Sequence, residues 1–477
     1  MPHILHVTPE VLPFSKTGGL ADVSRALPEA LSRLGHKVTV VTPLYACVDR
    51  TKVRQVPAMV QVRPAGVAFD VYESVLPAGT RVLFLANDDL FGRPHLYATR
   101  DGDYPDNYLR FGAFSSAVFG LMRALRLYPD VIHCHDWQAA LVPVYNAIHL
   151  DLFATVLTIH NLAYQGTFPP DVLPVLGLPW DLFNLEQMEF YGKVNFLKGG
   201  LCFADRITTV SPRYAREVMT PLFGCGLEGL LARRAGVVHG ILNGVDYGEW
   251  SPAYDPFIPA HFSADAMAGK AACRAALVEK MGLSDGPGPI FGAVGRLAAQ
   301  KGFDLLASVV PDMVALGARV VILGTGEALV EDMLARCAIP GKVAVRIAYD
   351  NALAHLIEAG SDFFVMPSRY EPCGLNQLYS MAYGTLPIVH AVGGLDDTVV
   401  DVDEDPDQAT GLKFRTFTAE ALLDRVRRAI SLYGDPERLQ KVISRAMAQD
   451  YSWDVAARKY LTLYEELLES RRVGQAQ

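Results

Sequence analysis

Short apolar runs, each followed by a turn containing Gly, Ser or Asp and then by a helical stretch, recur along the whole sequence. The candidate strands of the first half are ILHVT, KVTVVTP, RVLFLA, VIHCHD, TVLTIHN and RITTVS, and those of the second half are PIFGAVGR, ARVVILGTG, KVAVRIAY, FFVMPS and LPIVHAV. Because runs rich in Val and Ile without polar alternation are typical of parallel sheets buried on both faces, an α/β fold is predicted. Helices between such strands form right-handed βαβ units, so each half is expected to be a doubly wound, Rossmann-like domain.

The chain has 477 residues, which favours two domains or more over a single core. The segment EWSPAYDPFIPAHFSAD, which follows ILNGVD, is rich in proline and is expected to be an extended connection. We therefore predict an N-terminal domain over 1–246 and a C-terminal domain over 247–451. The last stretch, 452–477, is predicted to be a helix, and the N-terminal domain is one of the two surfaces on which it could pack.

Composition excludes several classes of partner. The formal net charge of −9 argues against nucleic acid and against an anionic membrane surface. No run reaches the roughly 18 apolar residues of a membrane-spanning helix. The seven cysteines form no CxxC pair, which indicates free thiols and a cytoplasmic location. An anionic ligand would have to be bound by a local group of Lys and Arg side chains.

The segment KTGGLADV, 16–23, joins the first predicted strand to a helix whose apolar residues recur at helical spacing up to Gly35. Backbone N–H groups at a helix N-terminus bind anions, glycine permits close approach, and Lys16 adds a full charge. The order of a Walker loop is missing, so the alternative is a simple strand-to-helix corner. A similar segment, GGLDDTV, occurs at 393–399, where chance is the alternative explanation.

Two further segments lie where a strand is followed by a helix. GTGEAL, 324–329, has Leu329 where a dinucleotide fingerprint needs glycine or alanine, so no nicotinamide cofactor is expected, although a nucleotide could contact its backbone. In GRLAAQKG, 295–302, Arg296 and Lys301 could hold a diphosphate without a metal. The alternative for these two cations is a pair of solvated surface charges.

Glu371, in PSRYEPCGLNQLYSMAYG, follows a predicted strand and could bind sugar hydroxyls, stabilise a developing cation, or cap the next helix. His160 ends the predicted strand TVLTIH, where a packing role is the ordinary one. His133 and His135 of HCHDW share one strand face, but no further ligand at metal-binding spacing completes a zinc site, so no metal is predicted.

Taken together, the motifs KTGGLADV, HCHDWQAAL, TIHNLAYQG, NGVD, GRLxxQKG, PSRYEPCGLNQLY and VGGLDDTV follow the order and spacing found in bacterial glycogen synthases and plant starch synthases. The resemblance extends over essentially the whole chain. It implies a retaining glycosyltransferase of GT-B architecture, with two Rossmann-like domains facing an interdomain cleft. It also implies transfer of glucose from ADP-glucose to the non-reducing end of glycogen or a maltooligosaccharide, without a metal or pyridoxal phosphate.

The resemblance also implies roles for individual residues. Catalysis would involve His160, Glu371, Lys16, Arg296 and Lys301. The nucleotide and diphosphate would be bound by Lys16, Gly18, Gly19, Arg296, Lys301, Gly324, Tyr349, which would stack on adenine, and Leu375. The sugar would contact His160, Asn243, Glu371, Cys373 and Gly374, and the acceptor side would include Asp22, Tyr97 and Asp136.

The chain departs from the family pattern at Ala298 and Ala299, where the family often has a bulkier pair, and at Asp396, which replaces an alanine. It lacks the extensions and the arginine-rich regulatory helix of the animal synthases, which favours ADP-glucose over UDP-glucose. Four rivals are less consistent with the motifs: a phosphorylase, a sucrose or trehalose-type synthase, a non-catalytic glucan-binding protein and an NAD-dependent oxidoreductase. The sequence does not indicate the oligomeric state.

Overall fold

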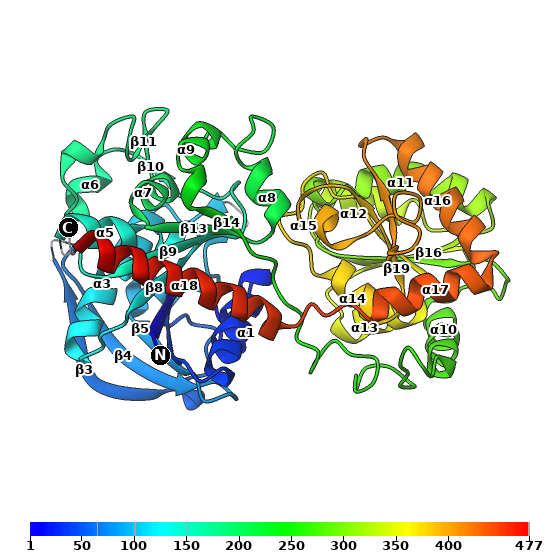
Figure 1. Ribbon diagram of the computed structural model, residues 1–477, viewed down its shortest axis with the longest axis horizontal. Helices are drawn as coiled ribbons and strands as arrows, with labels where there is room; N and C mark the ends of the chain where they lie inside the picture. Colours follow the sequence, from blue (N-terminus) through cyan, green and yellow to red (C-terminus); the bar gives the residue numbers. More distant parts are fainter. Residues whose placement is uncertain (64, 100–101, 150, 476–477) are drawn as a thin grey trace. The chain divides into compact units, whose positions relative to one another are not determined.

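The computed structural model describes residues 1–63, 65–99, 102–149 and 151–475. The chain forms two compact units (Figure 1). Unit 1 contains Met1–Val210, Ala215–Gly244 and the chain from Trp453 onward, and unit 2 contains Ser211–Tyr214 and Val245–Ser452. The chain therefore leaves unit 1 after Gly244, close to the boundary proposed from the sequence, and returns to it at Trp453.

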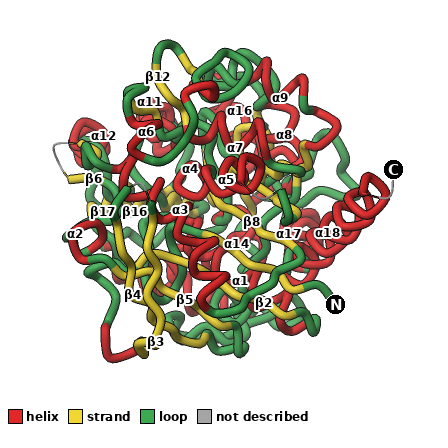
Figure 2. Tube along the Cα trace, turned by 90° about the vertical axis from the view of Figure 1, so that its left-hand side faces the viewer, coloured by secondary structure: helices red, strands yellow, loops and turns green. Residues whose placement is uncertain are grey.

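The main sheet of unit 1 has nine strands. In spatial order they are β14 (Val238–Gly240), β13 (Arg206–Thr209), β9 (Ala154–Ile159), β8 (Val131–His135), β1 (His3–Val7), β2 (Lys37–Pro43), β5 (Arg81–Ala86), β4 (Val67–Val75) and β3 (Arg54–Val62). The strands from β14 to β5 pair in parallel, whereas β4 and β3 continue the sheet in antiparallel fashion. Figure 2 shows β3, β4 and β5 side by side.

Helices of the first 244 residues connect these strands. They are α1 (Gly19–Arg33), α2 (Asp88–Phe91), α3 (Asn107–Ala124), α4 (Asp136–Ala139), α5 (Leu141–His149), α6 (Val172–Val175), α7 (Phe196–Phe203), α8 (Pro212–Glu217) and α9 (Glu228–Arg233). Two small sheets complete this part: β10 (Thr167–Phe168), β12 (Lys193–Asn195) and β11 (Glu189–Phe190), and the pair β6 (Ala98–Thr99) and β7 (Gly102–Asp103). As predicted, α1 ends before Gly35, whose φ of 90° lies in the left-handed region that glycine adopts easily.

Unit 2 contains a six-stranded parallel sheet. Its spatial order is β17 (Val343–Ile347), β16 (Arg319–Gly324), β15 (Ile290–Val294), β18 (Phe363–Met366), β19 (Leu386–His390) and β20 (Leu412–Phe414). Numbered along the chain this is the order 3-2-1-4-5-6 of a Rossmann fold. The helices are α10 (Ala268–Met281), α11 (Phe303–Ala315), α12 (Ala328–Ala335), α13 (Asn351–Gly360), α14 (Asn376–Ala382), α15 (Gly393–Thr398), α16 (Ala419–Tyr433) and α17 (Pro436–Met447).

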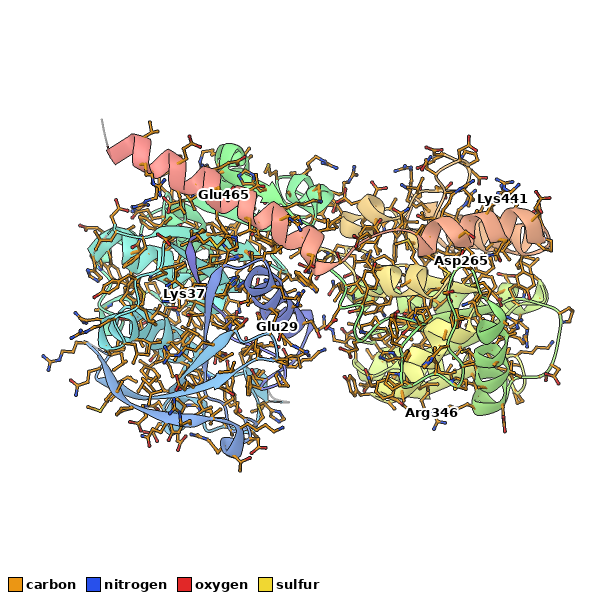
Figure 3. The ribbon with its side chains drawn as sticks, turned by 60° about the horizontal axis from the view of Figure 1, so that its bottom comes forward. Glu29, Lys37, Asp265, Arg346, Lys441 and Glu465 are labelled. Atoms are coloured by element: carbon orange, nitrogen blue, oxygen red, sulfur yellow. The ribbon has the colours of Figure 1, made fainter. Side chains whose placement is uncertain are left out.

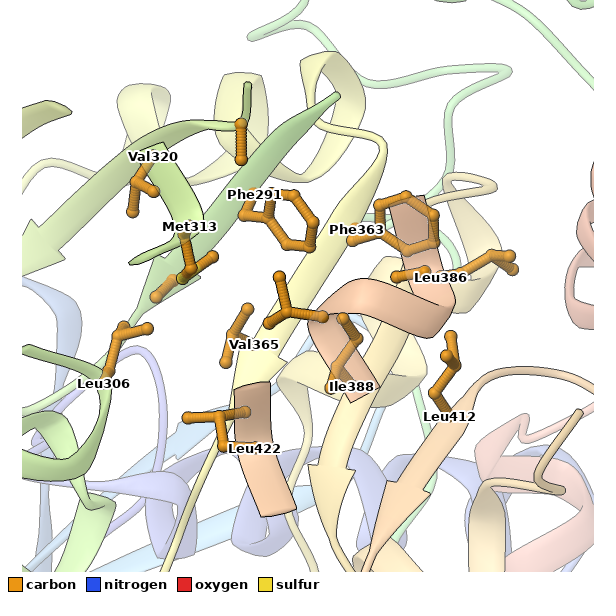
Figure 4. Close-up of a cluster of buried hydrophobic side chains, with 14 of the residues drawn as sticks. Phe291, Leu306, Met313, Val320, Phe363, Val365, Leu386, Ile388, Leu412 and Leu422 are labelled. Carbon is orange, nitrogen blue, oxygen red and sulfur yellow. The ribbon is translucent and has the colours of Figure 1, made fainter. Parts of the chain in front are cut away.

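The core of unit 2 lies between its sheet and the helices that follow the strands. Phe291, Phe363 and Ile388, from three strands of the sheet, lie in one buried cluster with Leu306 of α11 and Leu422 of α16 (Figure 4). Such apolar strands, buried on both faces, explain why the continuous Val- and Ile-rich runs of the sequence correctly predict a parallel sheet here.

In both units the strand order reverses at one point, and this point decides where a ligand can bind. The reversal lies between β1 and β8 in unit 1 and between β15 and β18 in unit 2. At such a point the loops that follow the two strands run in opposite directions and leave a crevice at the carboxyl ends of the strands. The loops concerned are those after β1 and β8, and those after β15 and β18.

The last helix, α18 (Trp453–Gln475), belongs to unit 1 and packs against α1 (Figure 1). Tyr460 and Tyr464 of α18 are fully buried in a cluster that also contains Leu27 of α1. The Tyr464 hydroxyl lies 2.7 Å from Nδ1 of the buried His133. Glu465, the next residue of the helix, has an exposed side chain (Figure 3).

We expect Tyr464→Phe to lower the free energy of unfolding by about 1–3 kcal/mol, because His133 Nδ1 loses its partner in a site without water access. Urea unfolding at neutral pH and hydrogen exchange of the β8 amides would measure the effect. Glu465→Ala on the same helix is the matched control and should change the stability by less than about 0.5 kcal/mol. Equal stability of the two variants would contradict the contribution of the Tyr464 hydrogen bond.

All eleven strands expected from the sequence are present. The pattern of apolar residues does not reveal β3 and β4, because one face of each is exposed and β3 contains Pro57, nor the three-residue β14 and β20. Among the described residues, no helix is both long and apolar enough to cross a membrane.

Candidate active site

The loop after β1 is held by a carboxylate that the sequence analysis did not single out, Glu10. Its Oε2 accepts a 2.6 Å hydrogen bond from the Thr17 N–H, and its Oε1 accepts one of the same length from the Tyr97 hydroxyl. Glu10 is 2 % exposed, and the Gly18 N–H is directed at the same carboxylate at 3.4 Å. Glu10 thus fixes the loop at 16–18 and places Tyr97, a predicted acceptor-side residue, beside it.

Lys16 and Asp22, which were assigned to the diphosphate and to the acceptor, form an ion pair with an N–O distance of 2.8 Å. Both side chains are partly exposed, so the pair contributes little to stability. A cavity of about 530 Å³ lies beside Lys16, Thr17 and Tyr97. The charge of Lys16 therefore lies in the lining of a cavity in unit 1.

Asp136 and His160 directly follow the carboxyl ends of β8 and β9, at the edge of the sheet where the strand reversal leaves a crevice. Asp136 Oδ1 accepts a 2.8 Å hydrogen bond from the His160 N–H, which fixes the backbone where His160 begins the loop. Asp136 has φ of 54°, a left-handed conformation that Asp and Asn tolerate better than most residues. Burial lowers the pKa of His160 to about 3, so its imidazole is neutral at physiological pH.

A third histidine, His6, lies next to His133 and His135, contrary to the expectation that nothing completes this cluster. Among the described residues these three form the one group of His, Cys, Asp or Glu that could hold a metal, with ligand atoms within 4.8 Å of one another. The nitrogens of His133 are already engaged, by Tyr464 at 2.7 Å and by Thr158 Oγ1 at 2.6 Å. His6 and His135 bond to each other at 3.0 Å. This pattern favours a hydrogen-bonded cluster over a metal site.

In unit 2 the two loops at the strand reversal supply opposite charges that meet. Lys301 Nζ, after β15, lies 2.6 Å from Glu371 Oε2, after β18. Glu371 is 5 % exposed and also accepts a 3.0 Å hydrogen bond from Ser368. Arg296 is exposed, and its guanidinium lies 3.2 Å from Gln300 Oε1. Glu371 is therefore paired with Lys301 and does not cap α14.

The turn that begins at Gly324 packs closely on the loop after β15. A Cβ at Gly324 would lie 2.1 Å from the Gly295 carbonyl oxygen, and one at Gly326 would lie 2.3 Å from that of Leu297. The Gly326 N–H donates to Glu331 at 2.7 Å. Close backbone packing explains why both positions are glycine.

The remaining predicted residues differ in exposure. Tyr349, beyond β17, is 82 % exposed, as an aromatic platform for a base would require. Cys373 is buried, Gly374 has φ of 72°, and Leu375 is the residue that precedes α14. Asn243 of unit 1 is 7 % exposed, and its Oδ1 is buried with no hydrogen-bond partner among the described residues.

Comparison with known proteins identifies the family. The model of the starch synthase catalytic domain matches residues 3–233, and that of glycosyl transferases group 1 matches 279–447. The chain is 50 % identical to a glycogen synthase of Koribacter versatilis, over 98 % of this chain and 99 % of the relative, and 47 % identical to one of Myxococcus xanthus, with the same coverage. The chain belongs to the glycogen synthase family.

Solved structures agree with this family assignment. The catalytic domain of starch synthase IV from Arabidopsis thaliana, bound to ADP and acarbose, is 33 % identical, with a TM-score of 0.90 and coverage of 98 % of this chain and 99 % of that one. A sucrose-phosphate synthase from Thermosynechococcus elongatus, 19 % identical with a TM-score of 0.62, shares the fold. The protein is thus a glycosyltransferase with the GT-B fold, as the sequence motifs implied.

Asp136 gives this member of the glycogen synthase family a testable pH dependence. Burial raises the pKa of Asp136 to about 7, although the N–H groups of His160 and Asn161 oppose the shift. Because the folded chain holds this proton more tightly than the unfolded chain, the wild type loses stability as the pH rises from about 4 to about 7. Asp136→Asn keeps an acceptor for the His160 N–H and cannot ionise. We expect its stability relative to wild type to increase over that interval and to level off above it.

Urea unfolding midpoints of the two proteins at a series of pH values would measure this difference. The other titrating groups are the same in both proteins, so their contributions cancel in the difference between the two stabilities. A difference that does not change between pH 4 and pH 7 would contradict the raised pKa of Asp136.

Proposed function

We propose that this protein transfers glucose from ADP-glucose to the non-reducing end of an α-1,4-glucan with retention of configuration, in glycogen synthesis. The observation that carries the proposal is the ion pair between half-buried Lys301 and buried Glu371 at the strand reversal of unit 2, with Arg296 on the same loop as Lys301, in a member of the glycogen synthase family. A cation next to a carboxylate suits a donor in which an anionic diphosphate is joined to a neutral sugar. We further propose a cytoplasmic location, which the seven free cysteines support.

Cationic side chains bind the diphosphate, and no metal is needed. The groups proposed for this role are Arg296, Lys301, Lys16 and the backbone of the Gly18–Gly19 segment. As the bond from the sugar to the phosphate breaks, negative charge grows on the leaving phosphate oxygen. Fixed cations bind that charge more strongly than they bind the ground state, so they accelerate the reaction.

The sugar is held by Asn243, Glu371 and the backbone of the loop that follows Glu371. Asn243 Oδ1, buried without a partner among the described residues, accepts a hydrogen bond from a glucose hydroxyl. Glu371 accepts another and provides a negative charge near the developing oxocarbenium, while the backbone of Cys373 and Gly374 contacts the same sugar. Tyr349 stacks on adenine beside Gly324 and Leu375. The acceptor glucan lies over Asp22, Tyr97 and Asp136.

In the transfer step the bond from the anomeric carbon to the phosphate oxygen breaks, and a bond from that carbon to the acceptor hydroxyl oxygen forms on the same face. The acceptor's proton passes to the leaving phosphate oxygen. His160, whose pKa is lowered to about 3 by burial, stays neutral and takes no part as an acid at physiological pH.

Glucose incorporation into glycogen from ADP-glucose and from UDP-glucose, measured side by side with and without EDTA, tests this function. We expect transfer from ADP-glucose that resists EDTA, and an α-linkage in the product. Preference for UDP-glucose would overturn the donor assignment but leave the reaction class. Loss of activity with EDTA would overturn the metal-free mechanism, and absence of transfer from either donor would overturn the proposed function.

A further inference from the structure

Three imidazoles form a continuous hydrogen-bonded chain that ends at His160. His6 Nδ1 lies 3.0 Å from His135 Nε2, and His135 Nδ1 lies 3.0 Å from His160 Nε2. His6 and His135 are fully buried, and they come from adjacent strands, β1 and β8. We call His6, His135 and His160 the histidine chain.

All three members of the histidine chain are neutral. Burial lowers the pKa of His6 and of His160 to about 3 and that of His135 well below its ordinary value. A neutral imidazole carries one N–H and one lone pair. Each ring between two neighbours must therefore donate on one side and accept on the other, so both hydrogen bonds run in the same direction along the chain. Two directions satisfy this condition.

The buried end of the chain discriminates between the two directions. His6 Nε2 is buried and has no hydrogen-bond partner among the described residues. If the bonds ran from His160 toward His6, this nitrogen would carry an unpaired N–H. If they run from His6 toward His160, it carries only an unpaired lone pair. Buried donors without a partner are rarer in proteins than buried acceptors without one, which favours the second direction.

The second direction determines the tautomer of every ring. His6 donates from Nδ1 to His135 Nε2, and His135 donates from Nδ1 to His160 Nε2. Since His160 Nε2 accepts, the proton of His160 is on Nδ1. That nitrogen makes no hydrogen bond to another described residue.

We propose that His6 and His135 are positioning residues that hold His160 in its Nδ1–H tautomer, so that His160 offers a hydrogen-bond donor to a substrate oxygen. The placing of substrate at His160 rests on the proposed function, whereas the tautomer does not. The Nδ1–H of such a neutral ring donates a hydrogen bond to a lone pair of a sugar oxygen. Because Nε2 is occupied by His135, the ring cannot take up the proton of the attacking glucan hydroxyl. It also keeps its orientation, because a ring held at Nε2 by His135 and at its backbone N–H by Asp136 has little freedom to rotate.

The direct test is nuclear magnetic resonance of the full chain with ¹⁵N-labelled histidine, in which long-range proton–nitrogen correlations distinguish a protonated from an unprotonated ring nitrogen. The His160→Asn variant identifies the His160 signals by their loss. We expect His160 Nδ1 to be protonated and Nε2 unprotonated at neutral pH, with or without transfer activity. A protonated Nε2 at His160 would overturn the proposal even if the enzyme transfers glucose as expected, and failure of the transfer assay alone would leave it standing.

Variants of His6 test the positioning role. His6→Leu removes the donor to His135, and we expect His160 then to populate both tautomers and kcat to fall about tenfold, the effect of one neutral hydrogen bond. His6→Asn, whose amide nitrogen can replace Nδ1, should restore the single tautomer and most of kcat.

His133→Leu is the matched control, because His133 is equally buried next to His6 but bonds to Tyr464 and Thr158 instead of to the histidine chain. It should reduce stability and leave the tautomer of His160 unchanged. An equal change of tautomer in His133→Leu and His6→Leu would overturn the proposal. If His6→Leu does not fold, the wild-type spectrum decides the question by itself.

Discussion

Replacing Glu371 with Gln is expected to reduce glucosyl transfer by about a thousandfold, the upper part of the range for removal of one preorganised polar group from an active site. Glu371 Oε2 lies 2.6 Å from Lys301 Nζ, and the two side chains are only 7 % and 26 % exposed, so water screens this pair less than it screens a surface pair. Glutamine keeps the size of the side chain and can still accept from Ser368, but it supplies no charge to Lys301 or to the developing oxocarbenium. Single-turnover transfer from ADP-glucose would measure the loss.

The chain contains a matched control for this substitution. Lys441 and Glu437 on α17 form an ion pair with an N–O distance of 2.7 Å, but their side chains are 61 % and 83 % exposed. Lys441 is labelled in Figure 3. Glu437→Gln should leave the transfer rate unchanged, because exposed pairs of this kind contribute little. A loss of less than tenfold in Glu371→Gln would contradict the electrostatic role assigned to Glu371.

The second large effect is expected at Gly394. A Cβ there would lie 2.0 Å from the Cys373 carbonyl oxygen, a contact with backbone that no side-chain rotation can relieve. Gly394→Ala should therefore displace the loop that carries Glu371 and Cys373. We expect loss of stability of about 1–3 kcal/mol together with loss of transfer, measured by urea unfolding and by the glycogen assay. Wild-type activity in this variant would contradict the dependence of Glu371 on this close packing.

Gly18, in the similar segment of unit 1, should behave differently. Its φ of −154° is an extended conformation open to any residue, and a Cβ would have no atom within 4 Å. Gly18→Ala should thus keep the stability within about 0.5 kcal/mol. If the diphosphate approaches this backbone, the added methyl group should raise the KM for the donor about tenfold, a change equivalent to one lost hydrogen bond. An unchanged KM would contradict the proposed contact between the donor and this segment.

Local patterns in the sequence were sufficient to predict the parallel sheets. Every Val- and Ile-rich run predicted to be a strand forms one, and most of these strands are buried on both faces, although the edge strand β17 is partly exposed. The strand order was not predicted, because hydrophobic pattern does not state which strands are neighbours. The sequence nevertheless indicates in outline that Lys301 and Glu371 lie on the same side of the sheet. Each belongs to a motif that follows a strand, and the carboxyl ends of parallel strands share one edge of a sheet.

The contacts that the sequence analysis missed depend on that order. His6 aligns with His133 because β1 lies beside β8, and His135 aligns with Thr158 because β8 lies beside β9. Nothing in the spacing of residues 6, 135 and 160 indicates that they meet. Glu10 was missed for the same reason, since its partner Tyr97 is 87 residues away in the chain. The partners of a single histidine or glutamate can be predicted only once it is known which strands lie next to each other.

The return of the chain to unit 1 at Trp453 has a consequence for biosynthesis. Unit 2 is almost continuous in sequence and is complete once Ser452 has left the ribosome, whereas unit 1 lacks α18 until the residues from Trp453 onward have also been synthesised. Until then the apolar residues of α1 that face Tyr460 and Tyr464, such as Leu27, remain uncovered. Unit 2 can therefore finish folding before unit 1. A nascent chain arrested before residue 453 exposes the apolar surface of α1, which chaperones that bind apolar surfaces would recognise.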